Sequence, residues 1–113
     1  MAGAQTLGAS TALPSAQEYF GDDYYGRERF RKYLTYFPSE GPILDFGCGD
    51  GVFLNLLRRE GRAGRGIDYD LTNVERGRAF GLDIVHADIF EFAKREEEKD
   101  RYAGIMMADF VEH

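Results

Sequence analysis

The apolar residues of this chain fall into two alternating patterns, short continuous runs and stripes with helical spacing. The run over 43–46 lies between breaker residues, as is typical of a buried strand. Residues 52–57 follow with their apolar positions at the spacing of one helix face. The same alternation predicts further strands over 65–68, 84–85 and 102–108, and further helices over 70–80 and 89–95.

The N-terminal part of the chain has a different pattern. Residues 1–17 are small and polar without a period, and we expect them to form a disordered leader. The apolar residues between 30 and 37 are spaced i, i+3, i+4, i+7, which predicts one helix face that ends before Pro38. We therefore divide the chain into a leader (1–17), an N-terminal helical or lid segment (18–41) and an α/β domain (42–113).

Strands that alternate with helices predict βαβ units and a mostly parallel sheet. Right-handed crossovers place the 43–46 strand centrally and the helices on both faces. Ligands of such doubly wound sheets bind at the carboxyl ends of the strands, near the point where the strand order reverses. We expect a Rossmann-like α/β fold of about four strands.

Composition narrows the class of protein. The 20 acidic and 14 basic residues give a formal net charge of -6, which disfavours nucleic acid as a partner because phosphate backbones attract basic surfaces. The single cysteine excludes a disulfide framework. No apolar run is long enough to cross a membrane, and residues 1–16 lack the features of a secretory signal. We therefore expect a cytoplasmic protein with no membrane partner.

The strongest chemical signal is the loop over 45–51, Asp-Phe-Gly-Cys-Gly-Asp-Gly, between the first strand and the next helix. Glycines there allow a sharp turn and a close approach of the backbone to a ligand. The third glycine comes one residue too early for the dinucleotide fingerprint, and the Gly-Lys-Ser/Thr of a P-loop is absent. The acids Asp45, Asp50 and Asp109 near this edge repel pyrophosphate and favour a cationic ligand.

This loop resembles the acid-x-Gly-x-Gly-x-Gly motif of the class I S-adenosylmethionine-dependent methyltransferases. The resemblance runs from about Tyr24 to the end of the sequence. It includes residues 68–69 after the second strand, 87–89 after the third, and 108–113, which end in Glu-His, after the fourth. It implies the transfer of a methyl group from S-adenosylmethionine to an unidentified acceptor, which we expect to be a small molecule.

The resemblance also implies a role for each segment in binding S-adenosylmethionine. The glycine loop makes room for the methionine part, and Asp45 helps to hold its ammonium group. Asp68 binds both ribose hydroxyls, and Tyr69 lies against adenine. Asp88 accepts the adenine amino proton, and the backbone N–H of Ile89 meets the ring. With Asp109 at the methionine end, the predicted cofactor-binding residues are Asp45, Gly47, Cys48, Gly49, Gly51, Asp68, Tyr69, Asp88, Ile89 and Asp109.

Other readings of the site stay open at this point. We assign no catalytic residue, because the cofactor is already activated and a base is needed only where the acceptor must lose a proton. The spacing of Asp109, Glu112 and His113 would suit a divalent metal on a helix, but the spacing is weak and we expect no metal. A non-catalytic module that holds S-adenosylmethionine or S-adenosylhomocysteine is the second function. The glycine spacing disfavours a nicotinamide-dependent oxidoreductase.

The resemblance is to a family whose sheet normally has seven strands, whereas this sequence reaches the fourth. Either the sequence is a fragment of a longer gene, or a partner completes the sheet. Both explanations leave the fourth strand at an open edge, where backbone groups can pair with another chain. We therefore expect either a homodimer formed through this edge or a chain of poor stability.

Overall fold

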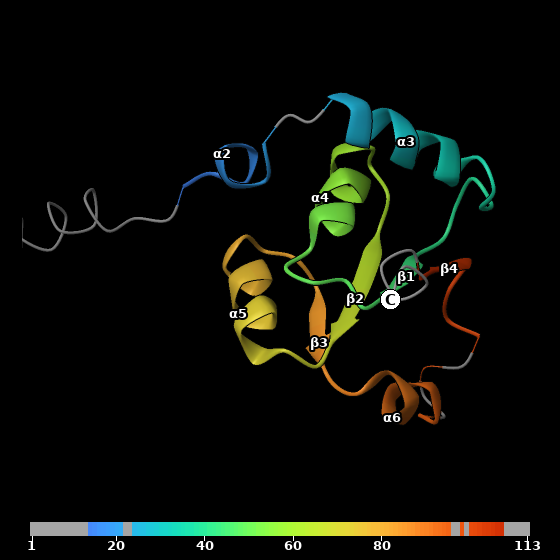
Figure 1. The fold of residues 1–113 in the computed structure, drawn as a ribbon. Coiled ribbons are helices and arrows are strands. Elements are labelled where there is room, and N and C mark those ends of the chain that lie inside the picture. Colours follow the sequence, from blue (N-terminus) through green and yellow to red (C-terminus); the bar gives the residue numbers. More distant parts are fainter. Residues whose placement is uncertain (1–13, 22–23, 96–97, 99, 108–113) are drawn as a thin grey trace, which may run out of the picture.

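The computed structural model describes residues 14–21, 24–95, 98 and 100–107 of the chain. Four parallel strands form one sheet in the order β3-β2-β1-β4 (Figure 1). The predicted central position of the first strand is confirmed, and the strand order reverses beside it, between β1 and β4. The strands are β1 (Ile43–Phe46), β2 (Gly64–Asp68), β3 (Ile84–His86) and β4 (Gly104–Met106).

Helices cover both faces of this sheet, and an apolar cluster lies on each face. Side chains alternate across a strand, so Ile43 of β1 lies in one cluster whereas Leu44 and Phe46 lie in the other. This arrangement confirms the Rossmann-like, doubly wound α/β fold. The helices are α2 (Ala16–Phe20), α3 (Tyr24–Leu34), α4 (Val52–Arg59), α5 (Leu71–Ala79) and α6 (Ile89–Ala93).

An aspartate is the N-cap of each of the two helices that follow β2 and β3. Asp70 Oδ1 accepts hydrogen bonds from the backbone N–H groups of Thr72, at 2.9 Å, and Asn73, at 3.4 Å. These N–H groups have no partner within the first turn of a helix, so the cap stabilises the start of α5. The prediction that Asp70 is the N-cap of this helix is confirmed. Asp88 caps α6 in the same way.

The helix α2 corrects one boundary of the sequence analysis. Ala16 and Gln17 lie in α2 and not in an unstructured leader. The cause is a capping box: the Ser15 side chain accepts from the Glu18 N–H at 3.1 Å, and Glu18 Oε1 accepts from the Ser15 N–H at 2.8 Å. The rest of the predicted leader lies outside the described residues, except Pro14 and Ser15.

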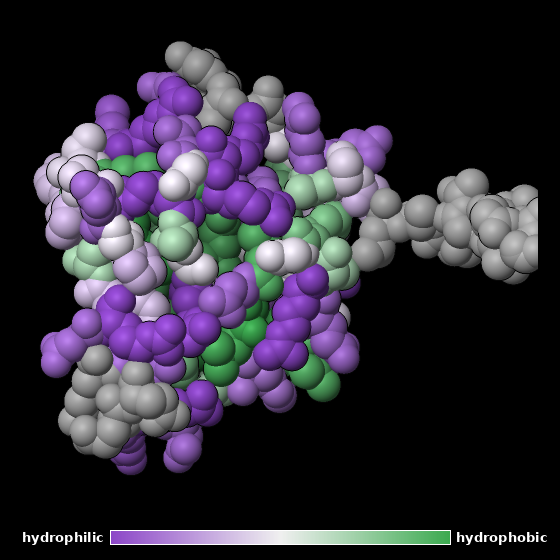
Figure 2. Space-filling model, turned by 180° about the vertical axis from the view of Figure 1, so that it is seen from behind, coloured by the Kyte–Doolittle hydropathy of each residue, from purple (hydrophilic) through white to green (hydrophobic). Residues whose placement is uncertain are grey.

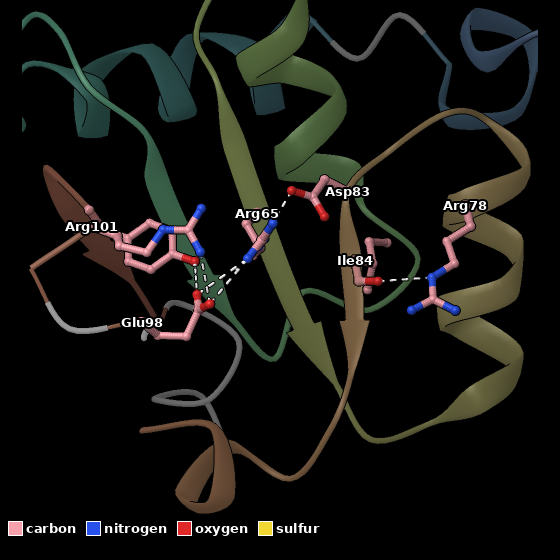
Figure 3. A network of polar contacts seen from close by, with 7 residues as sticks. Arg65, Arg78, Asp83, Ile84, Glu98 and Arg101 are labelled. Carbon is pink, nitrogen blue, oxygen red and sulfur yellow. Dashed lines mark hydrogen bonds and ion pairs between the residues drawn. The ribbon is translucent and has the colours of Figure 1, made fainter. Parts of the chain in front are cut away.

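A polar network ties β2 to the segment before β4 (Figure 3). Arg65 of β2 pairs with Asp83 at 2.9 Å and with Glu98 at 3.3 Å. Arg101 and the Tyr102 hydroxyl also donate to Glu98. The hydrogen bond from Tyr102 lowers the pKa of Glu98, so this side chain stays ionised among its partners. Glu98 thus joins Arg101 and Tyr102, which precede β4, to Arg65 of β2.

The face of the sheet that carries α6 is only partly covered. A groove of about 350 Å³ lies there. Figure 2, which views the molecule from behind, shows hydrophobic residues among hydrophilic ones at the surface of that face. The groove is lined by Leu44, Phe46, Phe92, Ala93, Arg95, Glu98, Asp100, Tyr102 and Ile105.

In the part of the chain that the structure describes, no helix is long and apolar enough to cross a membrane.

Candidate functional site

The carboxyl ends of β1, β2 and β3 lie side by side and are joined by backbone hydrogen bonds. The N–H groups of Gly47 and Cys48 both donate to the Ile67 carbonyl oxygen, at 2.8 and 3.1 Å. The Ala87 N–H donates to the Asp68 carbonyl oxygen at 3.1 Å. Three predicted ligand-binding segments, which are far apart in the sequence, therefore meet at one edge of the sheet, as the fold class requires.

The glycine loop combines open backbone with close packing. Gly47 and Gly49 have φ angles of 73° and 61°, which residues with a Cβ rarely adopt. Among the described residues, no atom lies within 4 Å of where a Cβ of either glycine would be, so the space beside their backbone is open to a ligand. At Gly51 a Cβ would lie 2.5 Å from the Leu82 side chain, so this glycine serves packing. Gly47 and Gly49 thus leave room for a ligand, as predicted for the loop, whereas contact of Gly51 with a ligand stays a prediction.

Asp68 connects the end of β2 with this loop. Its Oδ2 atom accepts from the Gly49 N–H at 2.8 Å, and its Oδ1 atom accepts from the Asp70 N–H at 2.9 Å. A carboxylate oxygen can accept more than one hydrogen bond, so both atoms keep acceptor capacity for a diol. The predicted ribose-binding carboxylate is therefore held in place by backbone groups on both sides.

Cys48 of the loop and Asp45 at the end of β1 are both buried, and each residue is only 5% exposed. Burial raises the pKa of the Cys48 thiol, and the charges of Asp45 and Asp68 raise it further. Cys48 is thus a neutral thiol at neutral pH, which is unsuited to nucleophilic catalysis. Contact between Asp45 and a ligand ammonium group stays a prediction.

Two exposed aromatic side chains follow the ends of β2 and β3, Tyr69 directly after Asp68 and Phe90 in the first turn of α6. Tyr69 is 79% exposed and Phe90 is 66% exposed. Large exposed aromatic side chains next to a polar edge are typical of a surface on which a planar ring can stack. His86 Nε2 lies 2.9 Å from the Tyr69 carbonyl oxygen and ties the two strand ends together. Sequence reasoning named Tyr69 but assigned no role to His86 and did not single out Phe90.

Asp88 and Ile89 occupy the turn from β3 into α6. Asp88 Oδ1 accepts from the backbone N–H groups of Phe90, at 2.8 Å, and Glu91, at 3.2 Å. Asp88 therefore has a structural role as a helix cap, and its role at adenine stays a prediction. Ile89 is half-buried and packs against the apolar cluster beneath α6.

Asp50 has a partner that sequence reasoning missed. Its Oδ2 atom accepts a hydrogen bond from the Tyr19 hydroxyl of α2 at 2.7 Å. The sequence analysis placed Asp50 only on the acidic rim of the loop. The capping box over 15–18 is the signal that could have predicted the helix that carries Tyr19, but it does not predict where this helix packs.

The last predicted site residue, Asp109, lies outside the described residues, as do Glu112 and His113. Within the described ranges, no group of three or more histidine, cysteine or acidic side chains is arranged to hold a metal ion.

Comparison with known families shows to which protein family this chain belongs. The model of a methyltransferase domain family matches residues 19–113. The chain belongs to this family. The match includes the glycine loop and the three segments that follow it, and it confirms the resemblance to class I methyltransferases, the fold class and S-adenosylmethionine as the family's cofactor. A comparison with the curated proteins found no match.

Solved structures of methyltransferases are similar to this chain. An S-adenosylmethionine-dependent methyltransferase from Archaeoglobus fulgidus is 29% identical with a TM-score of 0.55, over 69% of this chain and 35% of its own. A TehB-like methyltransferase from Corynebacterium glutamicum is 24% identical with a TM-score of 0.60, over 85% of this chain and 50% of its own. The CcbJ methyltransferase from Streptomyces caelestis is 19% identical with a TM-score of 0.59, over 85% and 39%. This chain thus spans between about a third and a half of these structures.

Proposed function

We propose that this chain carries the cofactor-binding half of a methyltransferase that transfers the methyl group of S-adenosylmethionine to a small-molecule acceptor. The observation that carries the proposal is the hydrogen bond between Asp68 and the Gly49 N–H. It brings the acid at the end of β2 to the open backbone of the glycine loop. A ribose bound by Asp68 then has the rest of the nucleoside beside Tyr69 and the methionine part beside Gly47 and Gly49.

The chemistry asks this chain to bind and orient rather than to react. When bound, S-adenosylmethionine supplies a sulfonium methyl group that an acceptor lone pair attacks in line, and the S–CH₃ bonding electrons stay on sulfur. The carboxylates at the loop complement the positive charge. Asp68 fixes the ribose, and Tyr69, the next residue, excludes water from one side of adenine. We assign no general base, because only an acceptor that must lose a proton needs one.

Calorimetry tests the proposal on the 113-residue chain. S-adenosylmethionine and S-adenosylhomocysteine should each bind with one-to-one stoichiometry, whereas NAD should not bind. A methyl-transfer assay with a panel of small-molecule acceptors and radiolabelled cofactor then tests turnover. Absence of binding by both adenosyl ligands, with the chain folded by circular dichroism, would refute the proposal.

The alternative is a module that binds S-adenosylmethionine or S-adenosylhomocysteine without turnover. It rests on the same residues as the first proposal, since every predicted site residue is assigned to cofactor binding and none to catalysis. Binding without transfer to any acceptor in the panel would support this alternative. Transfer to one acceptor would exclude it.

We also propose that the protein is cytoplasmic and has neither a nucleic acid nor a membrane as a partner. The formal charge of -6 supports the proposal on partners, because it opposes binding to phosphate backbones and anionic lipid surfaces. Retention on heparin or on anionic vesicles at physiological salt would contradict this part of the proposal.

A further inference from the structure

A side-chain contact joins α2 to the glycine loop across 31 residues of sequence. The Tyr19 hydroxyl donates to Asp50 Oδ2 at 2.7 Å. Figure 1 shows α2 apart from the sheet, beside α4 and near one end of α5. The hydrogen bond is thus a direct link from this peripheral helix to the segment that we expect to face the cofactor.

Packing fixes the direction of the Tyr19 ring, and hence the position of its hydroxyl. The ring centroid lies 5.0 Å from those of both Phe20 and Phe80. The guanidinium carbon of Arg76 lies 5.9 Å from the ring centroid. Three neighbours from α2 and α5 therefore hold a side chain that is itself 37% exposed. A hydroxyl held in this way restrains its acceptor more than a freely rotating one.

The backbone around Asp50 is restrained at neighbouring points as well. A Cβ at Gly77 of α5 would lie 2.7 Å from the Asp50 carbonyl oxygen, so helix and loop are in close contact there. On the preceding residue, the Gly49 N–H is held by Asp68. Consecutive loop residues are therefore held by different elements, Gly49 by β2 and Asp50 by α2 and α5.

We propose that Tyr19 is a positioning residue of the cofactor site, which holds the glycine loop through Asp50 in the conformation that leaves Gly47 and Gly49 open to S-adenosylmethionine. The link to the cofactor rests on the proposed function. The ordering of the loop by Tyr19 does not rest on it, because it is a property of the chain without ligand.

Ionisation sets the pH range of this contact. The hydrogen bond to Asp50 raises the pKa of Tyr19, and burial adds to the effect, whereas Arg76 lowers it. Because folding raises this pKa, the protonated hydroxyl stabilises the folded state fully below the ordinary tyrosine pKa. This stabilisation is lost as the pH rises through the pKa of the folded state. The contact is therefore intact at neutral pH and opens in the strongly alkaline range.

Tyr19→Phe tests the proposal because it keeps the ring and its packing and removes only the hydroxyl. In the ligand-free protein, amide hydrogen exchange at Gly49 and Gly51 should become roughly threefold to tenfold faster, as expected for the loss of one hydrogen bond to a charged acceptor. The dissociation constant for S-adenosylmethionine should rise by a similar factor. Tyr36→Phe is the matched control, since Tyr36 is 83% exposed, and it should change neither quantity.

A second pair of variants separates positioning from general loss of stability. Asp50→Asn keeps a side-chain oxygen that accepts from the Tyr19 hydroxyl, so it should retain most of the loop protection and of the affinity. Asp50→Ala should reproduce Tyr19→Phe, and the double variant should be no worse than either single one. The pKa of Tyr19, followed by NMR, should fall in Asp50→Ala, because the hydrogen bond that raises it is lost. An unchanged pKa would show that the bond is absent in solution and would overturn the proposal.

The outcomes distinguish this inference from the proposed function. Faster loop exchange in Tyr19→Phe, in a protein that does not bind S-adenosylmethionine at all, would uphold the positioning role and refute the cofactor assignment. Unchanged loop exchange and unchanged affinity in Tyr19→Phe, with a wild type that binds, would overturn the positioning role alone. Equal losses in Tyr36→Phe and Tyr19→Phe would also overturn it.

Discussion

At the scale of single residues, Asp68 is the side chain on which the cofactor site depends most. Both of its carboxylate oxygens accept backbone hydrogen bonds, from Gly49 on one side and from Asp70 on the other. Its geometry is therefore set before any ligand arrives, which lowers the entropic cost of binding a diol. Removing this carboxylate affects the ligand contact and the loop together.

Asp68→Ala should weaken S-adenosylmethionine binding by about 1–3 kcal/mol, because hydrogen bonds to a charged acceptor are the stronger kind. Isothermal titration calorimetry measures the change. The fold should survive, since the residue lies at a strand end. Unchanged affinity in this variant would show that the ribose role is wrong.

Asp70→Ala is the matched control, two residues along the chain. It removes the cap of α5, so the free energy of unfolding in urea should fall by about 1 kcal/mol. Cofactor affinity should stay at the wild-type level, because the Asp70 N–H that contacts Asp68 belongs to the backbone. A loss of affinity equal to that of Asp68→Ala would mean that the helix start, and not the carboxylate of Asp68, governs binding.

Cys48 should be chemically inert in the folded protein. Its raised pKa keeps the thiol neutral as the pH rises through the mildly alkaline range, and the thiolate is the form that reacts. Alkylation by iodoacetamide at mildly alkaline pH should be much slower in the native chain than in the chain unfolded by urea. Equal rates would contradict the burial that the structure shows.

Residue roles were predictable from the sequence where they depend on local spacing. Asp70 follows a strand and precedes a helical stripe, so its cap could be identified directly. The bond between Tyr19 and Asp50 could not, because it joins residues whose proximity depends on the packing of α2 against α5. Asp88 shows a third case, in which a capping role and a predicted ligand role fall on the same side chain.

At the scale of elements, α5 is placed by a contact that only glycine permits. In an exposed helix interior, replacing glycine by alanine stabilises by up to about 1 kcal/mol. At Gly77 the added Cβ would lie 2.2 Å from the Ile84 side chain and 2.7 Å from the Asp50 carbonyl oxygen. The helix is therefore packed against the glycine loop at the closest distance that its backbone allows.

Gly77→Ala should lower the free energy of unfolding by about 1–3 kcal/mol, the usual cost of overpacking, despite its better helix propensity. Chemical denaturation followed by circular dichroism measures it. Glu75→Ala, on the exposed side of the same helix, should stay within about 0.5 kcal/mol of wild type. A stabilised Gly77→Ala would contradict the close approach of α5 to the loop.

The strands and the helices α4 and α5 could be predicted to within a few residues, because each has a strong apolar pattern and a clear boundary residue. The helix predicted over 30–37 is instead α3 (Tyr24–Leu34), because its first turns lack the apolar stripe that marks the rest. β1 has the predicted bounds, and α5 lies between its predicted cap and Gly81. β4 (Gly104–Met106) is shorter than the strand predicted over 102–108, because a continuous apolar run does not show where the pairing with β1 begins and ends. α2 was missed because five residues are too few to show a period.

At the scale of the whole molecule, β4 forms an edge of the described sheet. Ile105, which lines the groove, is 52% exposed, and Met107, which follows β4, is 39% exposed. Edge strands with exposed apolar side chains pair readily with other chains. The chain should therefore form a dimer at increasing concentration in analytical ultracentrifugation, and Ile105→Lys should reduce it. Val52→Lys, at an exposed position of α4, should not. A wild type that stays monomeric would refute pairing through this edge.

The direct test of the central claim is a crystal structure of this chain grown with S-adenosylhomocysteine, the stable product of the proposed cofactor. The account predicts the ribose hydroxyls within hydrogen-bond distance of the Asp68 carboxylate, the adenine beside Tyr69, and the amino-acid part along Gly47 and Gly49. An adenosine bound elsewhere, or a glycine loop without ligand in crystals grown at saturating concentration, would contradict it.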